Sequence, residues 1–135
     1  MKKNIVGEHW TVMQTEKRPM LSWLELPTIN EFINKKISGD KNIDGYQLLR
    51  NYKKQFNSTL IVGCGNGQLE RDLYKFGLIK SALGIDIAKG SLDFASNMAK
   101  KNNINCFKYE MFDLETDKPD NLGKFDLILV PMVAH

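Results

Sequence analysis

From residue 58 onward, short apolar runs alternate with amphipathic stretches, and this alternation limits the possible folds more than any other feature of the chain. Strands that alternate with helices predict a parallel sheet with right-handed crossovers. Because the strands are apolar rather than alternately polar, both faces of the sheet should be covered. The predicted strands are Ser58–Val62, Ser81–Ile85, Cys106–Tyr109 and Phe125–Val130, and the predicted helices run from about Gln68 to Phe76 and from about Lys89 to Lys101.

The part of the chain before the first strand predicts helices. One helix should begin after Pro27, where Thr28 can cap it and Glu31 can reach back in a capping box. This helix should end at Gly39, and a second helix is expected from about Asp44 to Lys54. The first helix carries an apolar stripe of Ile29, Phe32, Ile33 and Ile37, and the second should bury Tyr46, Leu49 and Tyr52.

The whole chain of 135 residues is long enough for one domain. We expect an N-terminal helical or cap segment, residues 1–56, in which residues 1–26 have no firm period and form an irregular segment over the domain. Residues 57–135 then form the sheet domain.

Composition and charge exclude several classes of protein. Hydrophobic residues make up 42% of the chain and charged residues 26%, which is typical of a globular protein rather than a disordered one. The lysines are scattered and the net charge is only +3, which argues against a nucleic-acid partner. Two cysteines without metal-binding spacing predict reduced thiols. No signal peptide and no membrane-spanning apolar run are recognisable, so we expect a cytoplasmic protein without a membrane partner.

Three glycines in five residues follow the first predicted strand and precede a predicted helix. This is the place at which a parallel α/β sheet binds ligands. Glycine permits a sharp turn with positive φ and lets the backbone approach a ligand without a Cβ in the way. The helix N-terminus adds free N–H groups and a positive dipole end. The predicted ligand-binding loop is Gly63, Cys64, Gly65, Asn66 and Gly67, and the alternative is a turn that merely needs glycine.

The spacing of these glycines separates two classes of cofactor. A dinucleotide-binding loop, G-x-G-x-x-G, would have glycine at position 68, where this chain has Gln68. The G-x-G-x-G spacing instead resembles motif I of the class I S-adenosylmethionine-dependent methyltransferases, as does the run LIVGCGNGQLER. The resemblance implies a Rossmann-like, three-layer α/β fold with a mostly parallel sheet, and S-adenosylmethionine as the cofactor. A nicotinamide-dependent oxidoreductase is the alternative.

Two acidic residues after later strands agree with this resemblance. Asp86 ends the second predicted strand, where its carboxylate can accept hydrogen bonds from both ribose hydroxyls of an adenosine. A helix N-cap is the alternative role for Asp86, and Ile87 beside it is a further cofactor contact. After the third strand, the resemblance implies that Asp113 receives the adenine amino group and that Phe112 helps to sandwich the base. Glu110 and Glu115 are the alternatives to Asp113.

The fourth predicted strand resembles the family's motif F-D-x-I, so the resemblance covers residues 58–135. Asp126 at the start of this strand is interpreted as structural, because that end faces away from the site. The loop after the strand, with Val130, Pro131 and Met132, would border the methionine moiety of the cofactor. His135 is the candidate general base, against a chance residue at the terminus. His9 and Trp10 are candidates for a lid, against packing or a surface position.

The sequence departs from the family's pattern at two places. Family members usually have an acidic residue two positions before the first glycine, where this chain has Ile61, and neither Glu70 nor Asp72 is at the matching position. The complete fold of the family has seven strands, whereas this chain ends after the fourth. We therefore expect a truncated chain with an incomplete sheet of about four strands. The edge of the fourth strand would then be exposed, for a partner chain or a homo-oligomer to cover.

The predicted function is S-adenosylmethionine-dependent methyl transfer to a small-molecule or glycan-type acceptor. The block from residue 27 to residue 40 resembles bacterial methyltransferases of sugar or glycan modification. The alternative is a non-catalytic cofactor-binding module, or one half of a split methyltransferase. No metal ligands are predicted.

Overall fold

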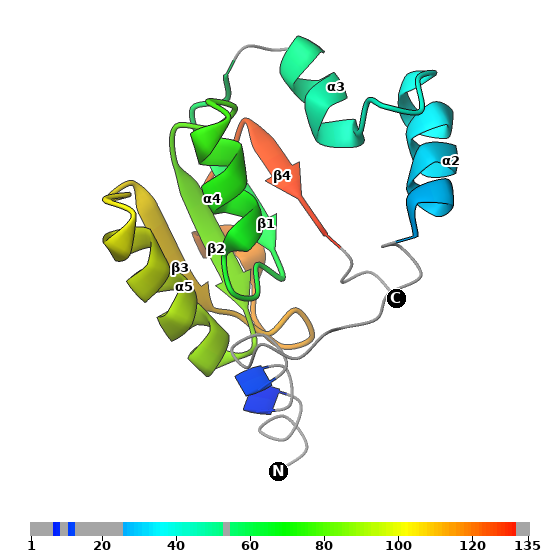
Figure 1. Cartoon of the computed structure of the whole chain (residues 1–135). Coiled ribbons are helices and arrows are strands. Elements are labelled where there is room, and N and C mark those ends of the chain that lie inside the picture. The colour runs from blue at the N-terminus through cyan, green and yellow to red at the C-terminus, as the bar shows by residue number, and fades with distance from the viewer. Residues whose placement is uncertain (1–6, 9–10, 13–25, 53–54, 132–135) are drawn as a thin grey trace. The chain divides into compact units, whose positions relative to one another are not determined.

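A computed structural model of the chain describes residues 7–8, 11–12, 26–52 and 55–131 (Figure 1). The chain divides into two compact units, residues 1–17 with 56–135 and residues 18–55, and each is described by itself. Among the described residues, no helix is both long and apolar enough to cross a membrane.

The first unit is built on one four-stranded sheet in the order β3-β2-β1-β4, and all of its strand pairings are parallel. A helix follows each of the first two strands, and a short 3-10 helix lies between β3 and β4. This arrangement confirms the predicted Rossmann-like α/β fold. The elements are β1 (Thr59–Val62), α4 (Gln68–Lys75), β2 (Ala82–Asp86), α5 (Lys89–Lys101), β3 (Phe107–Met111), η2 (Pro119–Asn121) and β4 (Leu127–Leu129).

The register of the sheet places a row of side chains on its helical face. Leu129 pairs with Ile61, which pairs with Gly84, which in turn pairs with Tyr109. Ile61, Tyr109 and Leu129 belong to one apolar cluster with Leu69 of α4 and Leu92 of α5. Figure 1 shows both helices on the same side of the sheet. Right-handed crossovers in one direction, from β1 to β2 to β3, place both helices on this face.

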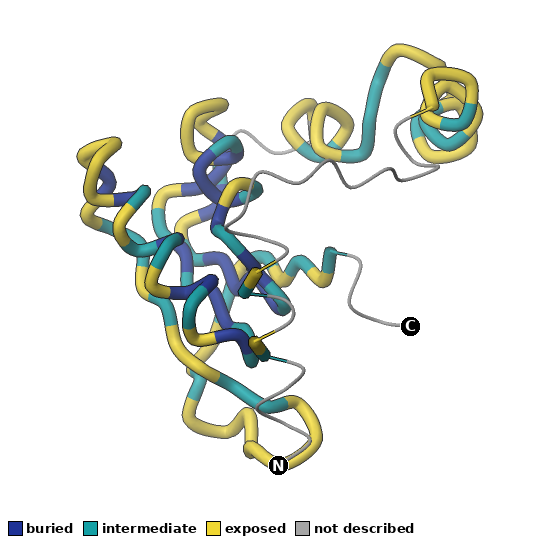
Figure 2. The backbone as a smooth tube through the Cα atoms, turned by 60° about the horizontal axis from the view of Figure 1, so that its bottom comes forward, coloured by how far each residue is buried: buried dark blue, intermediate teal, exposed yellow. Residues whose placement is uncertain are grey.

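The opposite face of the sheet is packed against the connection between β3 and β4 rather than against helices α4 and α5. Leu60, Val62 and Ile85 form its core, and the partly buried Leu122 and Phe125 of the β3–β4 connection pack against it. Figure 2 shows the buried residues gathered on the central strands and on the inner sides of α4 and α5. The expectation that every strand has both faces covered is therefore correct for β1, whose residues are all buried, and wrong for β4, where Ile128 is 56% exposed.

The fourth strand is shorter than predicted and begins at Leu127 rather than Phe125. Just before it, the carboxylate of Asp126 accepts a hydrogen bond of 2.9 Å from the backbone N–H of Asn57, and the backbone N–H of Asp126 donates to Ser58. Asp126 thus closes the end of the sheet away from the glycine loop, in agreement with its structural interpretation. The third strand is displaced as well, since it begins at Phe107 and continues beside β2 as far as Met111.

The second unit contains α2 (Pro27–Ser38) and α3 (Gly45–Tyr52). The predicted capping box is wrong: α2 begins at Pro27, its N-cap is Leu26, and no side chain caps it. Proline suits the first turn because it has no N–H to satisfy there, so Thr28 lies inside the helix. Gly39 does end the helix, with a φ of 82°.

The capping box occurs instead at the next helix. The carboxylate of Asp44 accepts a hydrogen bond from the backbone N–H of Gln47, and the Gln47 side chain accepts one from the backbone N–H of Asp44. None of the described residues of α2 is buried, and Tyr46 of α3 is exposed. The predicted burial of Tyr46 is therefore wrong: the short helix gives its apolar face too little to pack against.

Candidate functional site

The glycine loop lies between β1 and α4, as predicted, and turns in left-handed backbone conformations. Gly63, Gly65 and Gly67 have φ values of 70°, 55° and 74°, a region that side chains with a Cβ rarely adopt. The backbone N–H groups of Gly63 and Cys64 both donate to the carbonyl of Ile85, at 2.8 and 3.1 Å. The start of the loop is therefore fixed to the neighbouring strand.

Asp86 connects the loop to the turn before α5. One of its carboxylate oxygens accepts a hydrogen bond of 2.9 Å from the N–H of Gly65, and the other accepts one of 2.9 Å from the N–H of Ala88. The side chain is half-buried. A carboxylate has about four acceptor positions, so these two bonds leave Asp86 able to accept from a ligand as well.

Gly67 is required by packing inside the protein. A Cβ at this position would lie 2.8 Å from the Tyr109 hydroxyl oxygen, 2.8 Å from the Cβ of Ala95 and 2.9 Å from a guanidinium nitrogen of Arg71. Protein atoms therefore already occupy the space that a side chain at position 67 would need.

Arg71 holds the loop from within α4. Its side chain is almost fully buried, with 2% exposed. Nη1 donates a hydrogen bond of 2.7 Å to the backbone carbonyl of Asn66, and Nη2 donates one of 3.0 Å to the side chain of Gln68. The guanidinium thus bridges the end of the loop and the first residue of the helix.

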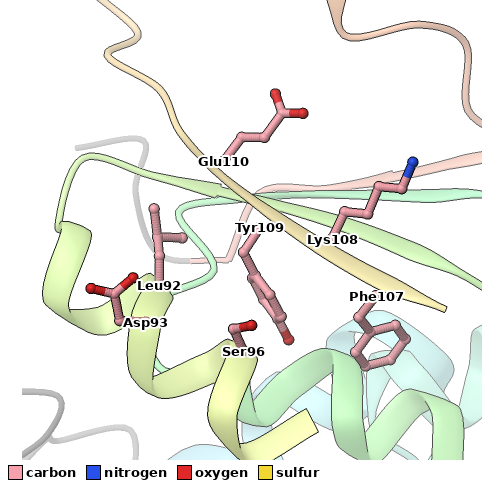
Figure 3. A pocket seen from close by; sticks show the side chains of 7 residues that line it. All are labelled: Leu92, Asp93, Ser96, Phe107, Lys108, Tyr109 and Glu110. Carbon is pink, nitrogen blue, oxygen red and sulfur yellow. The ribbon is translucent and has the colours of Figure 1, made fainter. Parts of the chain in front are cut away.

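Tyr109 lies beneath the loop and crosses the neighbouring strand at Gly84. In Figure 3, Tyr109 and Phe107 project to one side of β3, and Lys108 and Glu110 project to the other, as strand geometry requires. A Cβ at Gly84 would lie only 2.8 Å from the Tyr109 ring and 2.8 Å from the sulfur of Cys64. Gly84 therefore makes room for the ring that reaches Gly67.

Glu70, next to Arg71, is a buried acid. Its side chain is 0% exposed, and neither its carboxylate oxygens nor the Tyr109 hydroxyl has a well-formed hydrogen bond among the described residues. Burial raises the pKa of Glu70 to about 7, although its backbone N–H, the nearby Tyr109 hydroxyl and the charge of Arg71 oppose the rise. Burial, and then the charge of Glu70, raise the pKa of Tyr109.

Cys64 lies in the same buried layer. Burial raises the pKa of its thiol, and the charges of Glu70 and Asp86 raise it further. The sulfur points inward beneath the loop against Gly84, and the exposed fraction of Cys64 is only 7%. Its side chain therefore serves the packing of the loop.

The segment after β3 is less open than its motif implies. Phe112 is half-buried and packs with the cluster of Leu60, Val62 and Ile85. The carboxylate of Asp113 accepts a hydrogen bond of 2.9 Å from the N–H of Glu115, so it organises its own turn. The alternatives Glu110 and Glu115 are both exposed.

Residues 7 and 11 lie against the turn that follows Asp86. A Cβ at Gly7 would lie 3.2 Å from the carbonyl oxygen of Ile87, and a Cβ at Gly90 would overlap the side chain of Thr11. Ile87, a predicted cofactor contact, is half-buried. The N-terminal segment therefore borders the site at these two described positions. His9 and Trp10, the lid candidates, lie outside the described residues.

At the end of β4, Val130 is 50% exposed and Pro131 is half-buried. Met132 and His135 lie outside the described residues. A hollow of about 380 Å³ opens elsewhere, along the edge of β3, where Leu92, Asp93, Ser96 and the first four residues of β3 line it (Figure 3). Of the candidate cofactor residues, this hollow contains Glu110, an alternative to Asp113.

The comparisons with known proteins point to one family. A sequence model described as "Methyltransferase domain" matches residues 55–135, which include all the sheet and the glycine loop. This chain belongs to the methyltransferase domain family. No curated protein matches the chain significantly.

Solved structures resemble the methyltransferase domain over part of their length. A dimethyladenosine transferase from Plasmodium falciparum has a TM-score of 0.50 and 19% identity over 65% of this chain and 32% of its own, which shows the fold alone. PKMT2 from Rickettsia typhi, in complex with AdoHcy, has a TM-score of 0.44 and 25% identity over 54% of this chain and 14% of its own. YcgJ from Bacillus subtilis has a TM-score of 0.45 and 22% identity over 54% of this chain and 30% of its own. The chain thus spans a third or less of these structures.

Ile61 occupies the family's acidic position in this methyltransferase domain, and it is fully buried in the apolar cluster on the helical face. Glu70 is not a replacement that faces the loop surface, because it lies buried below the loop. The loop is held instead by Asp86 from one side and by Arg71 from the other.

Sequence reasoning missed Arg71 and Tyr109. Arg71 lies four residues after Gly67, the interval that brings helical residues to one face, but charged residues of helices usually face solvent. Gly84 inside an apolar strand was the available signal for Tyr109, since an interior glycine often marks a close approach of another group.

Proposed function

We propose that this methyltransferase domain binds S-adenosylmethionine at the carboxyl ends of β1 and β2 and takes part in transfer of its methyl group. One observation carries the proposal. In a chain that belongs to this family, the acid at the end of β2 is hydrogen-bonded to the glycine loop, at 2.9 Å from Gly65. The loop and the acid therefore form one preorganised unit at the edge of the sheet where ligands of parallel α/β folds bind.

The proposed contacts follow the order of the strands. The loop residues 63–67 receive the methionine part, the remaining acceptor positions of Asp86 receive the ribose hydroxyls, and Ile87 borders the adenosine. Phe112 and Asp113 contribute to the adenine side, and Val130 and Pro131 border the transferred methyl group. Support for these roles comes from the convergence of β1, β2 and β3 at one edge of the parallel sheet.

The cofactor would supply the chemistry, since its sulfonium carries an activated methyl group. The protein then has to position donor and acceptor in line and exclude water. A general base could assist an oxygen or nitrogen acceptor, and His135 is our candidate. Residues 57–135 would form the cofactor domain, with residues 1–56 as an N-terminal helical or cap segment.

We propose a small molecule or a glycan as the acceptor. The scattered lysines and the small net charge of +3 support this choice over a nucleic acid. The edge of β4 is a candidate contact for a partner chain or a second copy, because β4 pairs with β1 and its Ile128 is 56% exposed. Two free cysteines, Cys64 and Cys106, agree with a cytoplasmic setting.

Isothermal titration with S-adenosylhomocysteine tests the cofactor site. We expect micromolar binding, about −8 kcal/mol, which is lost in Asp86→Ala and retained in Asp93→Ala, whose exposed carboxylate pairs with Lys89. NADH serves as the competing cofactor. Binding of NADH in preference to S-adenosylhomocysteine, or equal binding by both variants, would refute the proposal. Binding without transfer to any acceptor would favour a non-catalytic module.

A further inference from the structure

The glycine loop rests on a buried polar layer that no cofactor role accounts for. Arg71 and Glu70 come from the first turn of α4, and Tyr109 comes from β3. Glu70 is 0% exposed and Arg71 is 2% exposed. Placing a charged pair and a phenol in a protein interior is costly unless the groups are paired and hydrogen-bonded.

Within this buried polar layer, Arg71 contacts the end of the glycine loop. Nη1 donates to the carbonyl of Asn66 at 2.7 Å, and the same nitrogen lies 2.9 Å from the position of a Cβ at Gly67. The Tyr109 hydroxyl lies 2.8 Å from that same position. The guanidinium and the phenol therefore lie together on the side of Gly67 that a Cβ would occupy.

The charge of Arg71 has a nearby counterpart in Glu70. Within the described part of the chain, no well-formed hydrogen bond satisfies the carboxylate of Glu70. Arg71 and Tyr109 are both coupled to it electrostatically. Such coupling is strong because a protein interior screens charge weakly.

We propose that Arg71 is a positioning residue of the cofactor site: its buried guanidinium, seated beside Glu70 and Tyr109, fixes Asn66 and Gly67 in the conformation that receives the ligand. The proposal rests on the proposed function in assuming that this loop binds the cofactor. Arg71 does not touch the ligand itself, because it acts through the carbonyl of Asn66 from inside the domain.

Arg71→Met separates the donor role from packing, because methionine fills much of the same volume without any N–H group. Lys75→Met, at an exposed position of the same helix, is the matched control. Hydrogen exchange of the backbone amides of residues 65–67 is measured in the free protein, and the Kd for S-adenosylhomocysteine is measured by calorimetry. Arg71→Lys, which keeps the charge and a donor, is the conservative variant.

We expect Arg71→Met to accelerate exchange at residues 65–67 at least tenfold, with the amides of β1 and β2 unchanged, and to raise the Kd at least tenfold. Arg71→Lys should recover part of both losses, and Lys75→Met should match the wild type. Wild-type exchange in Arg71→Met would overturn the proposal. So would an equal acceleration in β1 and β2, because it would report a general loss of stability.

The two proposals fail in different ways. If the wild-type protein does not bind S-adenosylhomocysteine, the proposed function fails, while selective loosening of the loop in Arg71→Met still supports the positioning role. If the wild type binds and Arg71→Met binds equally well, the positioning role fails and the proposed function stands.

Discussion

The backbone N–H of Gly65 donates a hydrogen bond of 2.9 Å to Oδ2 of Asp86, and this bond joins the glycine loop to the end of the neighbouring strand. The other oxygen of the same carboxylate accepts a hydrogen bond from the N–H of Ala88. One side chain thus holds the two turns that a ligand at the edge of the sheet would touch. Its contribution to stability can be measured without any ligand.

Replacing Asp86 by alanine should lower the free energy of unfolding by about 1–3 kcal/mol, because two backbone N–H groups lose their acceptor. Urea denaturation at pH 7 measures this change. Asp93→Ala removes an exposed carboxylate on α5 and should change the free energy of unfolding by less than about 0.5 kcal/mol. Equal stability of the two variants would show that the Gly65 and Ala88 contacts do not hold the loop.

Glu70→Gln should change how stability depends on pH. Burial raises the pKa of Glu70 from 4.5 to about 7 in the folded protein. The stability that the neutral Glu70 side chain contributes is therefore fully present below pH 4.5. As the pH rises to about 7, the free energy of unfolding loses roughly 3 kcal/mol from this group. The variant has no such group, so its free energy of unfolding should fall less over this range.

Urea denaturation at half-unit pH intervals from 4.5 to 8 compares Glu70→Gln with the wild type. Glu110→Gln, on the exposed side of β3, is the matched control. Parallel curves for Glu70→Gln and the wild type would contradict the buried environment of this carboxyl group.

Gly84→Ala should destabilise the sheet by about 1–3 kcal/mol, because the added Cβ would collide with the Tyr109 ring and with Cys64. A second substitution, Tyr109→Leu, should restore part of the loss by removing the ring. Gly45→Ala is the contrasting control, since its nearest neighbour is 3.9 Å away and alanine favours a helix. The free energies of unfolding of the wild type, the two single variants, the double variant and the control test this prediction. Additive effects in the double variant would show that the two sites do not touch.

Gly90→Ala should displace Thr11 from the start of α5, because the added Cβ would overlap the Thr11 side chain. Thr11→Ser, which removes the obstructing methyl group, should restore the contact in the double variant. Hydrogen exchange of the segment around residue 11 measures the displacement, which should appear as faster exchange in Gly90→Ala alone. Unchanged exchange in the single variant would place residue 11 away from α5.

The sequence predicted the site best where a single backbone or strand property decides the outcome. The glycines at 63, 65 and 67 require positive φ, and they occupy the turn between β1 and α4 as expected. Helix α5 has the predicted bounds, since its apolar period of Leu92, Ala95 and Ala99 is unambiguous. The strand order follows from short right-handed crossovers, which allow few alternatives.

Predictions failed where other residues, near or distant in the sequence, determine whether a side chain caps a helix, is buried or has room. Thr28 and Glu31 fit a capping box, but Pro27 begins the helix. Tyr46 fits an amphipathic stripe, yet it is exposed, because an apolar face is buried only where another surface meets it. The reason that Gly67 has no side chain is likewise invisible locally, since the atoms that exclude a Cβ come from α4, α5 and β3.

By itself, the sequence determined the order of strands and helices and the position of the glycine loop, because spacing and glycine conformations are local properties. Tertiary structure alone decided what lies beneath the loop. Residues 84 and 109 become neighbours through the register of β2 and β3, and residues 71 and 109 come together beside Gly67 only when α4 packs on the sheet. Their buried polar contacts depend on distances between elements, and no period along the chain encodes those distances.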